Sequence, residues 1–349
     1  MKHTAMWQEI QDQPEVAQKI LDAYLPKGEY FRDLLQGKKQ LVLTGIGASL
    51  YACHMARYAF LKYCSLKPQI IQSDELHYLL PSIDKDTLVI FISQSGESYE
   101  TKVVGKELKE RGIAFWGITN DPGSTLAENA SEVMLLHSGR EISSATKTNM
   151  ASFLILSIIA AGYRPELKEA FLEIPDTIRS TLTLCPEALE RLADALLPCM
   201  NLYLLGMGAN AATAIEGALM MKEKTFIHTS GSSVSDFRHG TVEVIEEGLP
   251  AVLLASGEEY TRTALEHGEY LQNAGVAVTL VTDTPIDGCI PPEHVIPVAK
   301  SREECLSPAA LLIPLQLLAE RVADKKGLDV DGFRYLSKVV GDYKKGEKA

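Results

Sequence analysis

Short runs of consecutive apolar residues alternate along this chain with longer segments of helical periodicity. The apolar runs lie near residues 40–45, 68–72, 87–93, 114–119 and 132–136 in the first half, and near 201–205, 250–255, 277–282 and 294–298 in the second. Apolar residues at successive positions are typical of strands that are buried on both faces. Because helical segments such as 97–111 and 259–274 separate these runs, the pattern predicts an α/β protein whose parallel sheets are covered by helices on both sides.

The chain also repeats itself. The segment 41–48 is echoed by 202–209, so that Gly206 lies 161 residues after Gly45, and Ser256 in a second match likewise lies 161 residues after Ser95. Two matches at one offset indicate that a whole domain is duplicated. We therefore predict two tandem doubly wound domains, three-layer sandwiches of the flavodoxin type, at residues 36–165 and 196–325. The remaining segments are predicted as a helical lead-in at 1–35, a helical linker at 166–195 and a C-terminal tail at 326–349.

The most informative polar segment is Ser93–Ser98, with the sequence Ser-Gln-Ser-Gly-Glu-Ser, which follows a buried apolar run and precedes a helical segment. Hydroxyls and free backbone N–H groups between a strand and the start of a helix favour an anion. Because no Walker pattern accompanies the segment, a phosphate monoester such as a sugar phosphate fits better than a nucleoside triphosphate. An ordinary polar turn is the alternative.

Ionisable residues also concentrate at 215–241. Glu216 and Glu223 are seven residues apart and therefore share one face of a predicted helix, where a carboxylate is a candidate proton-transferring base. His239 follows a stretch rich in Gly and Ser, interpreted as a flexible loop that lets the imidazole reach into a cleft. The alternatives are a structural hydrogen-bonding role for Glu216 and a surface ion pair with a neighbouring lysine for Glu223.

Composition limits the function further. A formal charge of −12 over 349 residues would repel a nucleic-acid backbone, so no nucleic-acid partner is expected. The six cysteines form no C-x-x-C pair and no ligand spacing indicates a metal. The glycine pairs at 45/47 and 206/208 lack the rest of a dinucleotide fingerprint, so no cofactor is predicted. The N-terminus has no apolar leader, which leads us to expect no membrane partner and a cytoplasmic location.

With these motifs in hand, the chain resembles the double sugar-isomerase (SIS) domain family, and most of all the isomerase half of glucosamine-6-phosphate synthase and the fructosamine-6-phosphate deglycases. The resemblance covers essentially the whole chain. The matching motifs are Glu9-Ile10-x-x-Gln13-Pro14, Gly47-Ala48-Ser49, Ser93–Ser98, Glu141-Ile142 with Ala145-Thr146, Glu216–Leu219 with Lys222-Glu223, His239-Gly240, and Asp329–Asp331 with Arg334 and Leu336–Lys338.

The resemblance implies a role for each matching residue. It makes Glu223 the catalytic base, His239 a ring-opening histidine contributed across a dimer interface, and Lys338 a tail lysine that engages the open-chain sugar. The implied phosphosugar-binding residues are Ser49, Ser93, Gln94, Ser95, Gly96, Ser98, Ala145, Thr146 and Ser337. The implied partners are a phosphosugar substrate and at least one further copy of the chain, and the tail is expected to complete the active site.

Two departures from the family pattern bear on the reaction. Met220 stands where the synthase carries a lysine, and Lys2 stands where its glutaminase domain has a nucleophilic cysteine, so a complete synthase is not expected. The predicted reaction is proton transfer between C1 and C2 of a 6-phosphorylated amino-ketose, with release of an amine and a sugar phosphate. A plain aldose–ketose isomerase and a non-catalytic phosphosugar-binding regulator are the alternatives.

Overall fold

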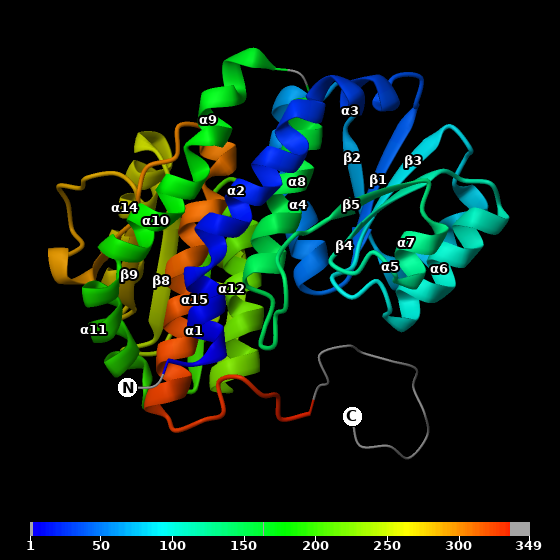
Figure 1. The fold of residues 1–349 in the computed structure, drawn as a ribbon. Coiled ribbons are helices and arrows are strands. Elements are labelled where there is room, and N and C mark those ends of the chain that lie inside the picture. The colour runs from blue at the N-terminus through cyan, green and yellow to red at the C-terminus, as the bar shows by residue number, and fades with distance from the viewer. Residues whose placement is uncertain (1–2, 163, 336–349) are drawn as a thin grey trace. The chain divides into compact units, whose positions relative to one another are not determined.

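A computed structural model describes residues 3–162 and 164–335, which fall into two compact units (Figure 1). The first-repeat unit comprises residues 15–169 with 333–335, and the second-repeat unit comprises residues 3–14 with 170–332. The divisions run through α2 (Gln13–Tyr24) and α9 (Lys168–Leu172). The residues predicted as a lead-in are thus shared between the two units.

The first-repeat unit is built on a sheet of five parallel strands in the order β2-β1-β3-β4-β5. These strands are β1 (Gln40–Gly45), β2 (Pro68–Gln72), β3 (Thr87–Ile92), β4 (Phe115–Thr119) and β5 (Glu132–Leu135). The five strands predicted for the first half of the chain are therefore confirmed. Consecutive apolar residues mark them because the central strands are buried on both faces, as in β3, where all six residues are buried.

Helices cover both faces of this sheet. Apolar side chains of three of them pack against Val42, Val89 and Phe91 on one face. These helices are α5 (Ser73–Leu79), α6 (Tyr99–Glu110) and α7 (Thr125–Asn129). The other face carries α4 (Ala48–Tyr63) and α8 (Lys147–Ala161), with α3 (Gly28–Leu35) beside α8. Every residue of α8 is buried, in agreement with the mostly apolar sequence that follows its polar first turn.

The second-repeat unit has the same topology, with strand order β10-β9-β8-β6-β7 and all strands parallel. The strands are β6 (Asn201–Gly206), β7 (His228–Ser233), β8 (Pro250–Ala255), β9 (Ala277–Thr282) and β10 (Val295–Pro297). Its helices are α1 (Ala5–Gln11), α10 (Ile174–Leu184), α11 (Pro186–Leu196), α12 (Asn210–Thr225), α13 (Val234–Arg238), α14 (Glu258–Asn273) and α15 (Pro308–Lys325). The predicted duplication of an α/β domain is confirmed.

Strand β7 corrects the sequence-based prediction, which placed a flexible loop here. Its sequence, His-Thr-Ser-Gly-Ser-Ser, has no apolar run because β7 is the edge strand of its sheet. Gly231 explains how so polar a strand packs: a Cβ at this position would lie 2.4 Å from the carbonyl oxygen of Ala214 on α12. Glycine therefore allows the backbones of β7 and α12 to meet directly.

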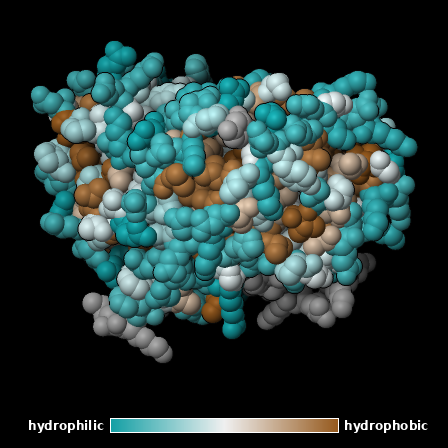
Figure 2. Space-filling view, turned by 45° about the horizontal axis from the view of Figure 1, so that its top comes forward, coloured by the Kyte–Doolittle hydropathy of each residue, from teal (hydrophilic) through white to brown (hydrophobic). Residues whose placement is uncertain are grey.

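The longest helix, α15, is a core helix. The segment Glu304–Lys325 is long and apolar enough by length and composition to cross a membrane, but 94% of its most apolar window is buried inside the protein. The face shown in Figure 2 is mostly hydrophilic, and its hydrophobic side chains form several separate areas.

Candidate functional site

The first-repeat sheet has its topological switch point between β1 and β3. These strands are neighbours, with Thr44 beside Phe91, but the chain continues from β1 to β2 on one side and from β3 to β4 on the other. Ligands of such sheets bind at the carboxyl ends of the strands at this point. Ser49 lies in the first turn of α4, just after β1, and Ser93–Ser98 joins β3 to α6. The structure thus brings both predicted phosphate-binding segments to one edge of the sheet.

The hydroxyls of this turn are held by backbone N–H groups. Ser93 Oγ accepts a hydrogen bond from the N–H of Gly96 (3.1 Å), and Ser95 Oγ accepts one from the N–H of Glu97 (3.2 Å). Ser98 is the N-cap of α6: its Oγ accepts from the N–H of Thr101 (3.4 Å) and shares a hydrogen bond with the Thr101 hydroxyl (2.6 Å), in which either can donate. A hydroxyl that accepts through its oxygen still has its own proton to donate. The turn therefore combines hydroxyl donors with the positive end of a twelve-residue helix.

The loop between β4 and α7, together with the first turn of α7, forms hydrogen bonds to the backbone of the Ser93–Ser98 turn. The carbonyl oxygen of Gln94 accepts from the N–H of Asn120 (2.9 Å), and that of Gly96 accepts from the N–H of Leu126 (3.1 Å). Gly96 has φ +65°, and a Cβ there would lie 2.2 Å from Ser124 Oγ. The shape of the turn is thus set by a neighbouring loop before any ligand binds, which lowers the cost of binding.

Glu97 anchors the turn to α7, although it is absent from the predicted site residues. Its carboxylate accepts from the N–H of Thr125 (2.5 Å) and forms an ion pair with Lys102 (3.1 Å). The hydrogen bonds from Thr125, together with Lys102, hold the pKa of Glu97 below its ordinary value. Glu97 therefore binds α7 as an ionised carboxylate at neutral pH.

The lowered pKa of Glu97 makes the stability of this unit depend on pH. A depressed carboxyl pKa stabilises the fold above the unfolded-state value of about 4.3, and this stabilisation is lost as pH falls through the folded pKa. Glu97→Gln should therefore lower the urea midpoint at pH 7, and the difference from the wild type should shrink below about pH 4. Glu110→Gln, at the far end of α6, is the control. A constant difference at all pH values would contradict a charged anchor.

A buried carboxylate organises the loop that carries Ala145 and Thr146. Glu141 accepts hydrogen bonds from the N–H groups of Thr146 (3.0 Å) and Thr148 (3.1 Å) and from both threonine hydroxyls (3.2 and 2.6 Å). The Thr146 hydroxyl is thus engaged inside the protein, whereas Ala145 is partly exposed. Asn149, in the first turn of α8, donates to the carbonyl oxygen of Ala48 (2.8 Å) and so ties α8 to the start of α4 beside Ser49.

In the second-repeat unit, α12 carries both predicted carboxylates. Glu216 is 1% exposed, whereas Glu223 is only partly buried and can meet solvent or a ligand. Met220, which replaces the family lysine, is 1% exposed. Lys224 is equally buried and donates to the carbonyl oxygen of Gly332 (3.1 Å). Lys224 therefore fixes the helix that carries Glu223 to the C-terminal segment. The sequence Lys222-Glu223-Lys224 alone does not show which of the two lysines is buried.

His239 follows β7 and the short helix α13, which it ends as the C-cap, and its side chain is exposed. The preceding residue, Arg238, is held against α14: its guanidinium lies 3.2 Å from Nε2 of His267 and 5.6 Å from the centre of the Tyr270 ring. Nδ1 of His267 lies 2.7 Å from the carbonyl oxygen of Thr263, which leaves Nε2 to accept from Arg238. These contacts position the backbone that carries His239.

The C-terminal segment is anchored before it reaches the predicted tail residues. The Asp331 carboxylate accepts from the N–H groups of Ala5 (2.9 Å) and Met6 (3.0 Å) at the start of α1. Asp329 accepts from the N–H groups of Asp331 (3.2 Å) and Gly332 (3.1 Å). Ser337 and Lys338 lie outside the described residues.

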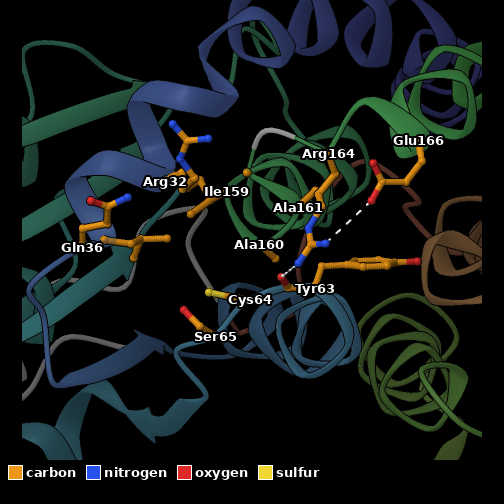
Figure 3. A pocket seen from close by; sticks show the side chains of 12 residues that line it. Arg32, Gln36, Tyr63, Cys64, Ser65, Ile159, Ala160, Ala161, Arg164 and Glu166 are labelled. Atoms are coloured by element: carbon orange, nitrogen blue, oxygen red, sulfur yellow. Dashed lines mark hydrogen bonds and ion pairs between the residues drawn. The ribbon is translucent and has the colours of Figure 1, made fainter.

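A cavity of about 470 Å³ in the first-repeat unit lies away from these groups (Figure 3). It is lined by the ends of α3, α4 and α8, and Arg164 there donates to the carbonyl oxygen of Tyr63 (3.0 Å) and pairs with Glu166 (3.7 Å). Helix α4 starts at the same end of the sheet as the Ser93–Ser98 turn and runs for 16 residues to Tyr63. About 24 Å of helix therefore separates the cavity from this turn. The cavity is therefore not part of the switch-point site.

Comparison with known proteins identifies the family of this fold. A family model described as SIS domain matches residues 34–161 and 195–322, so this chain belongs to the SIS domain family and carries the domain twice. The predicted resemblance is confirmed, because each match falls on one repeat.

Relatives and solved structures extend the likeness to nearly the whole chain. The chain is 29% identical over 96% of its length to a glutamine–fructose-6-phosphate aminotransferase [isomerizing] of Clostridium tetani, and it spans 58% of that relative. The C-terminal domain of the glucosamine-fructose-6-phosphate aminotransferase of Francisella tularensis has a TM-score of 0.84 at 24% identity, with 95% of this chain and 98% of that one covered. Glucosamine-6-phosphate deaminase of Thermotoga maritima has a TM-score of 0.77 at 19% identity, covering 97% and 100%. At these identities the two structures show a shared fold.

Proposed function

We propose that this chain is a sugar-phosphate enzyme that moves a proton between C1 and C2 of a 6-phosphorylated amino-ketose and releases an amine and a sugar phosphate. The observation that carries the proposal is the hydroxyl-lined turn Ser93–Ser98 at the β1/β3 switch point and the start of α6. Its size and donors suit one phosphate monoester. Membership of the SIS domain family and the names of its relatives support a phosphosugar as the substrate class.

The predicted binding residues are proposed to act as follows. The phosphate accepts from the hydroxyls of the turn and from backbone N–H groups at the start of α6, and Ser49 adds a hydroxyl from α4. Gly96 provides the positive φ that the turn requires, while Gln94 faces the sugar. Ala145 and Ser337 border the substrate, and the Thr146 loop, organised by Glu141, forms a wall. The two site residues of the C-terminal tail, Ser337 and Lys338, enter on the resemblance alone.

The reaction needs groups that carry protons. His239 moves a proton to open the sugar ring, which exposes the C2 carbonyl. Glu223 then removes a proton from C1 while the C2 oxygen gains a proton from solvent, which gives an enaminol. Glu223 returns its proton to C2 and the nitrogen loses its own proton to solvent, so that the C1–N bond becomes an imine. Water adds to this imine, and the C1–N bond breaks to release the amine and an aldose phosphate. Lys338 steadies the open-chain oxygen. Positioned acid–base groups typically contribute about 10²–10⁴-fold each.

An amine-releasing reaction fits this chain better than transfer of an amino group from glutamine. Met220, on α12, is 1% exposed and supplies neither a charge nor a hydrogen-bond donor at the position where the synthase has a lysine. We also propose that the active protein is a homodimer or a higher homo-oligomer in which one chain contributes His239 to the site of another. The exposure of His239 supports this arrangement.

The direct test is to incubate the protein with a panel of 6-phosphorylated glycated amino acids and to measure the amine released. We expect release from at least one member and none from its dephosphorylated form. Interconversion of a plain ketose phosphate with solvent deuterium at C1 or C2, and no amine from any member, would establish the aldose–ketose isomerase instead. Binding of phosphosugars with no chemistry would establish a regulator.

A further inference from the structure

The triplet Ser-Gly-Glu occurs in both repeats but sits in two different turns. In the first repeat, six residues (93–98) separate the end of β3 from the start of α6. In the second repeat, only Ser256 and Gly257 separate β8 from α14, which begins at the glutamate of the triplet. Both turns thus contain the serine hydroxyl and the glycine N–H, but only in the second repeat does the glycine directly precede the helix.

A carboxylate of the chain already occupies the second turn. Asp283, the first residue after β9, accepts from Ser256 Oγ through Oδ2 (2.5 Å) and from the N–H of Gly257 through Oδ1 (2.8 Å). Thr284 Oγ1 lies 2.9 Å from the same Oδ1. Hydroxyl and backbone N–H donors at the start of a sixteen-residue helix are the groups that bind a phosphate elsewhere. Asp283 satisfies them with an anion that is part of the protein.

The corresponding residue of the first repeat is neutral and turned away. Asn120 is the first residue after β4, as Asp283 is after β9, and in each case the preceding threonine hydroxyl accepts from the N–H two residues further on. Asn120 binds the next loop: its Oδ1 accepts from Ser138 Oγ (2.8 Å), and its Nδ2 donates to the carbonyl oxygen of Gly139 (2.7 Å). The first turn therefore meets no carboxylate from this position.

We propose that Asp283 is a built-in substitute for a bound phosphate, which closes the second repeat to anions, so that each chain binds one phosphate monoester through its first repeat. A carboxylate at this place satisfies the donors and repels an incoming phosphate dianion. This inference rests on the phosphate site in the proposed function. It goes beyond that function by explaining why a duplicated fold has a single site.

Stoichiometry tests this inference. Inorganic phosphate is titrated into the wild type, Asp283→Ala and Asp287→Ala, which removes the same charge from an exposed place in the same loop. We expect one phosphate per chain for the wild type and the control, and a second, weaker one for Asp283→Ala, whose turn has one hydroxyl where the first repeat has three. Phosphate should also raise the melting temperature of Asp283→Ala more than that of the wild type, because it replaces the lost acceptor.

The outcomes separate this inference from the proposed function. Two phosphates per wild-type chain, or a folded Asp283→Ala with the wild-type count, would overturn it. A wild type that binds none, with one phosphate in Asp283→Ala, would support it while removing the proposed first-repeat site. If Asp283→Ala does not fold, Asp283→Asn serves instead: it keeps an acceptor oxygen for Ser256 and Gly257 but removes the charge that repels phosphate, so phosphate should raise its melting temperature more than that of the wild type. An equal rise for Asp283→Asn and the wild type would also overturn the inference.

Discussion

Replacing Glu223 with glutamine is expected to lower the rate of proton transfer by about 10²–10⁴-fold and to leave the protein folded. A neutral amide keeps the shape of the side chain but cannot accept a proton from C1. Glu223 is only partly buried on α12, and the buried Lys224 fixes the end of that helix independently, so the core is not disturbed. The measurement is incorporation of solvent deuterium at C1 of a 6-phosphorylated amino-ketose that the wild type cleaves, followed by NMR.

Two comparisons make this prediction specific. Glu266→Gln changes the same group at an exposed position on α14 and should retain wild-type exchange. Glu223→Gln should also bind fructose 6-phosphate with nearly unchanged affinity, because the proposed phosphate contacts come from the first repeat. Full exchange activity in Glu223→Gln would end the proposal that this carboxylate is the base.

The same variant tests whether two chains share His239. Refolding Glu223→Gln together with His239→Ala gives mixed dimers, in which one site combines an intact Glu223 with an intact His239. Random pairing makes half of the dimers mixed, and each mixed dimer has one complete site of two, so roughly a quarter of the wild-type activity should return. An inactive mixture would show that both groups must come from one chain.

Replacing Gly96 with alanine should destabilise the first-repeat unit by about 2–5 kcal/mol and abolish phosphate binding. The glycine has φ +65°, which costs an alanine about 1–2 kcal/mol. In addition, the new Cβ would lie 2.2 Å from Ser124 Oγ and 2.5 Å from Ser124 Cβ, so the turn or the β4–α7 loop must move. Urea unfolding in a Trp7→Phe background measures the effect, because Trp116, 4% exposed in β4, then reports on this unit.

Gly139 provides the matched control for Gly96. It lies in the same unit with φ +63°, and a Cβ there would have open space around it. Gly139→Ala should therefore lose only the backbone term of about 1–2 kcal/mol and should keep phosphate binding. Equal destabilisation by the two substitutions would mean that the contact between the turn and Ser124 contributes nothing.

Local sequence patterns were sufficient to predict some strands of this protein but not others. β3 was predicted because six successive buried residues leave a signal that needs no knowledge of the fold. β7 was missed for the opposite reason: its one neighbouring strand is β6, its residues are polar, and Gly231 replaces side-chain packing with direct backbone contact to α12. A strand of this kind is defined by what it pairs with.

In the candidate site, too, some residues were recognised from the sequence and others only from the structure. Ser93–Ser98 was identified from hydroxyls between a strand and a helix, both of which are local features. Glu97 was not assigned a role, because its partner, the N–H of Thr125, comes from another loop of the sheet and becomes a neighbour only on folding. Glu141 was not assigned one either, because no sequence pattern shows that the loop folds back so that this carboxylate accepts from Thr146 and Thr148.

The α/β architecture, the duplication and the hydroxyl-rich turn between β3 and α6 follow from the sequence alone, since each depends on the order of residues within a short segment or on a repeated spacing. Which of the two Ser-Gly-Glu turns is occupied by a carboxylate of the chain is visible only in the folded protein. Asp283 reaches Ser256 because β8 and β9 are paired side by side, and no pattern within either segment records that meeting. Likewise, Lys224 is tied to Gly332, 108 residues further along the chain, by a hydrogen bond that exists only because folding brings the two segments together.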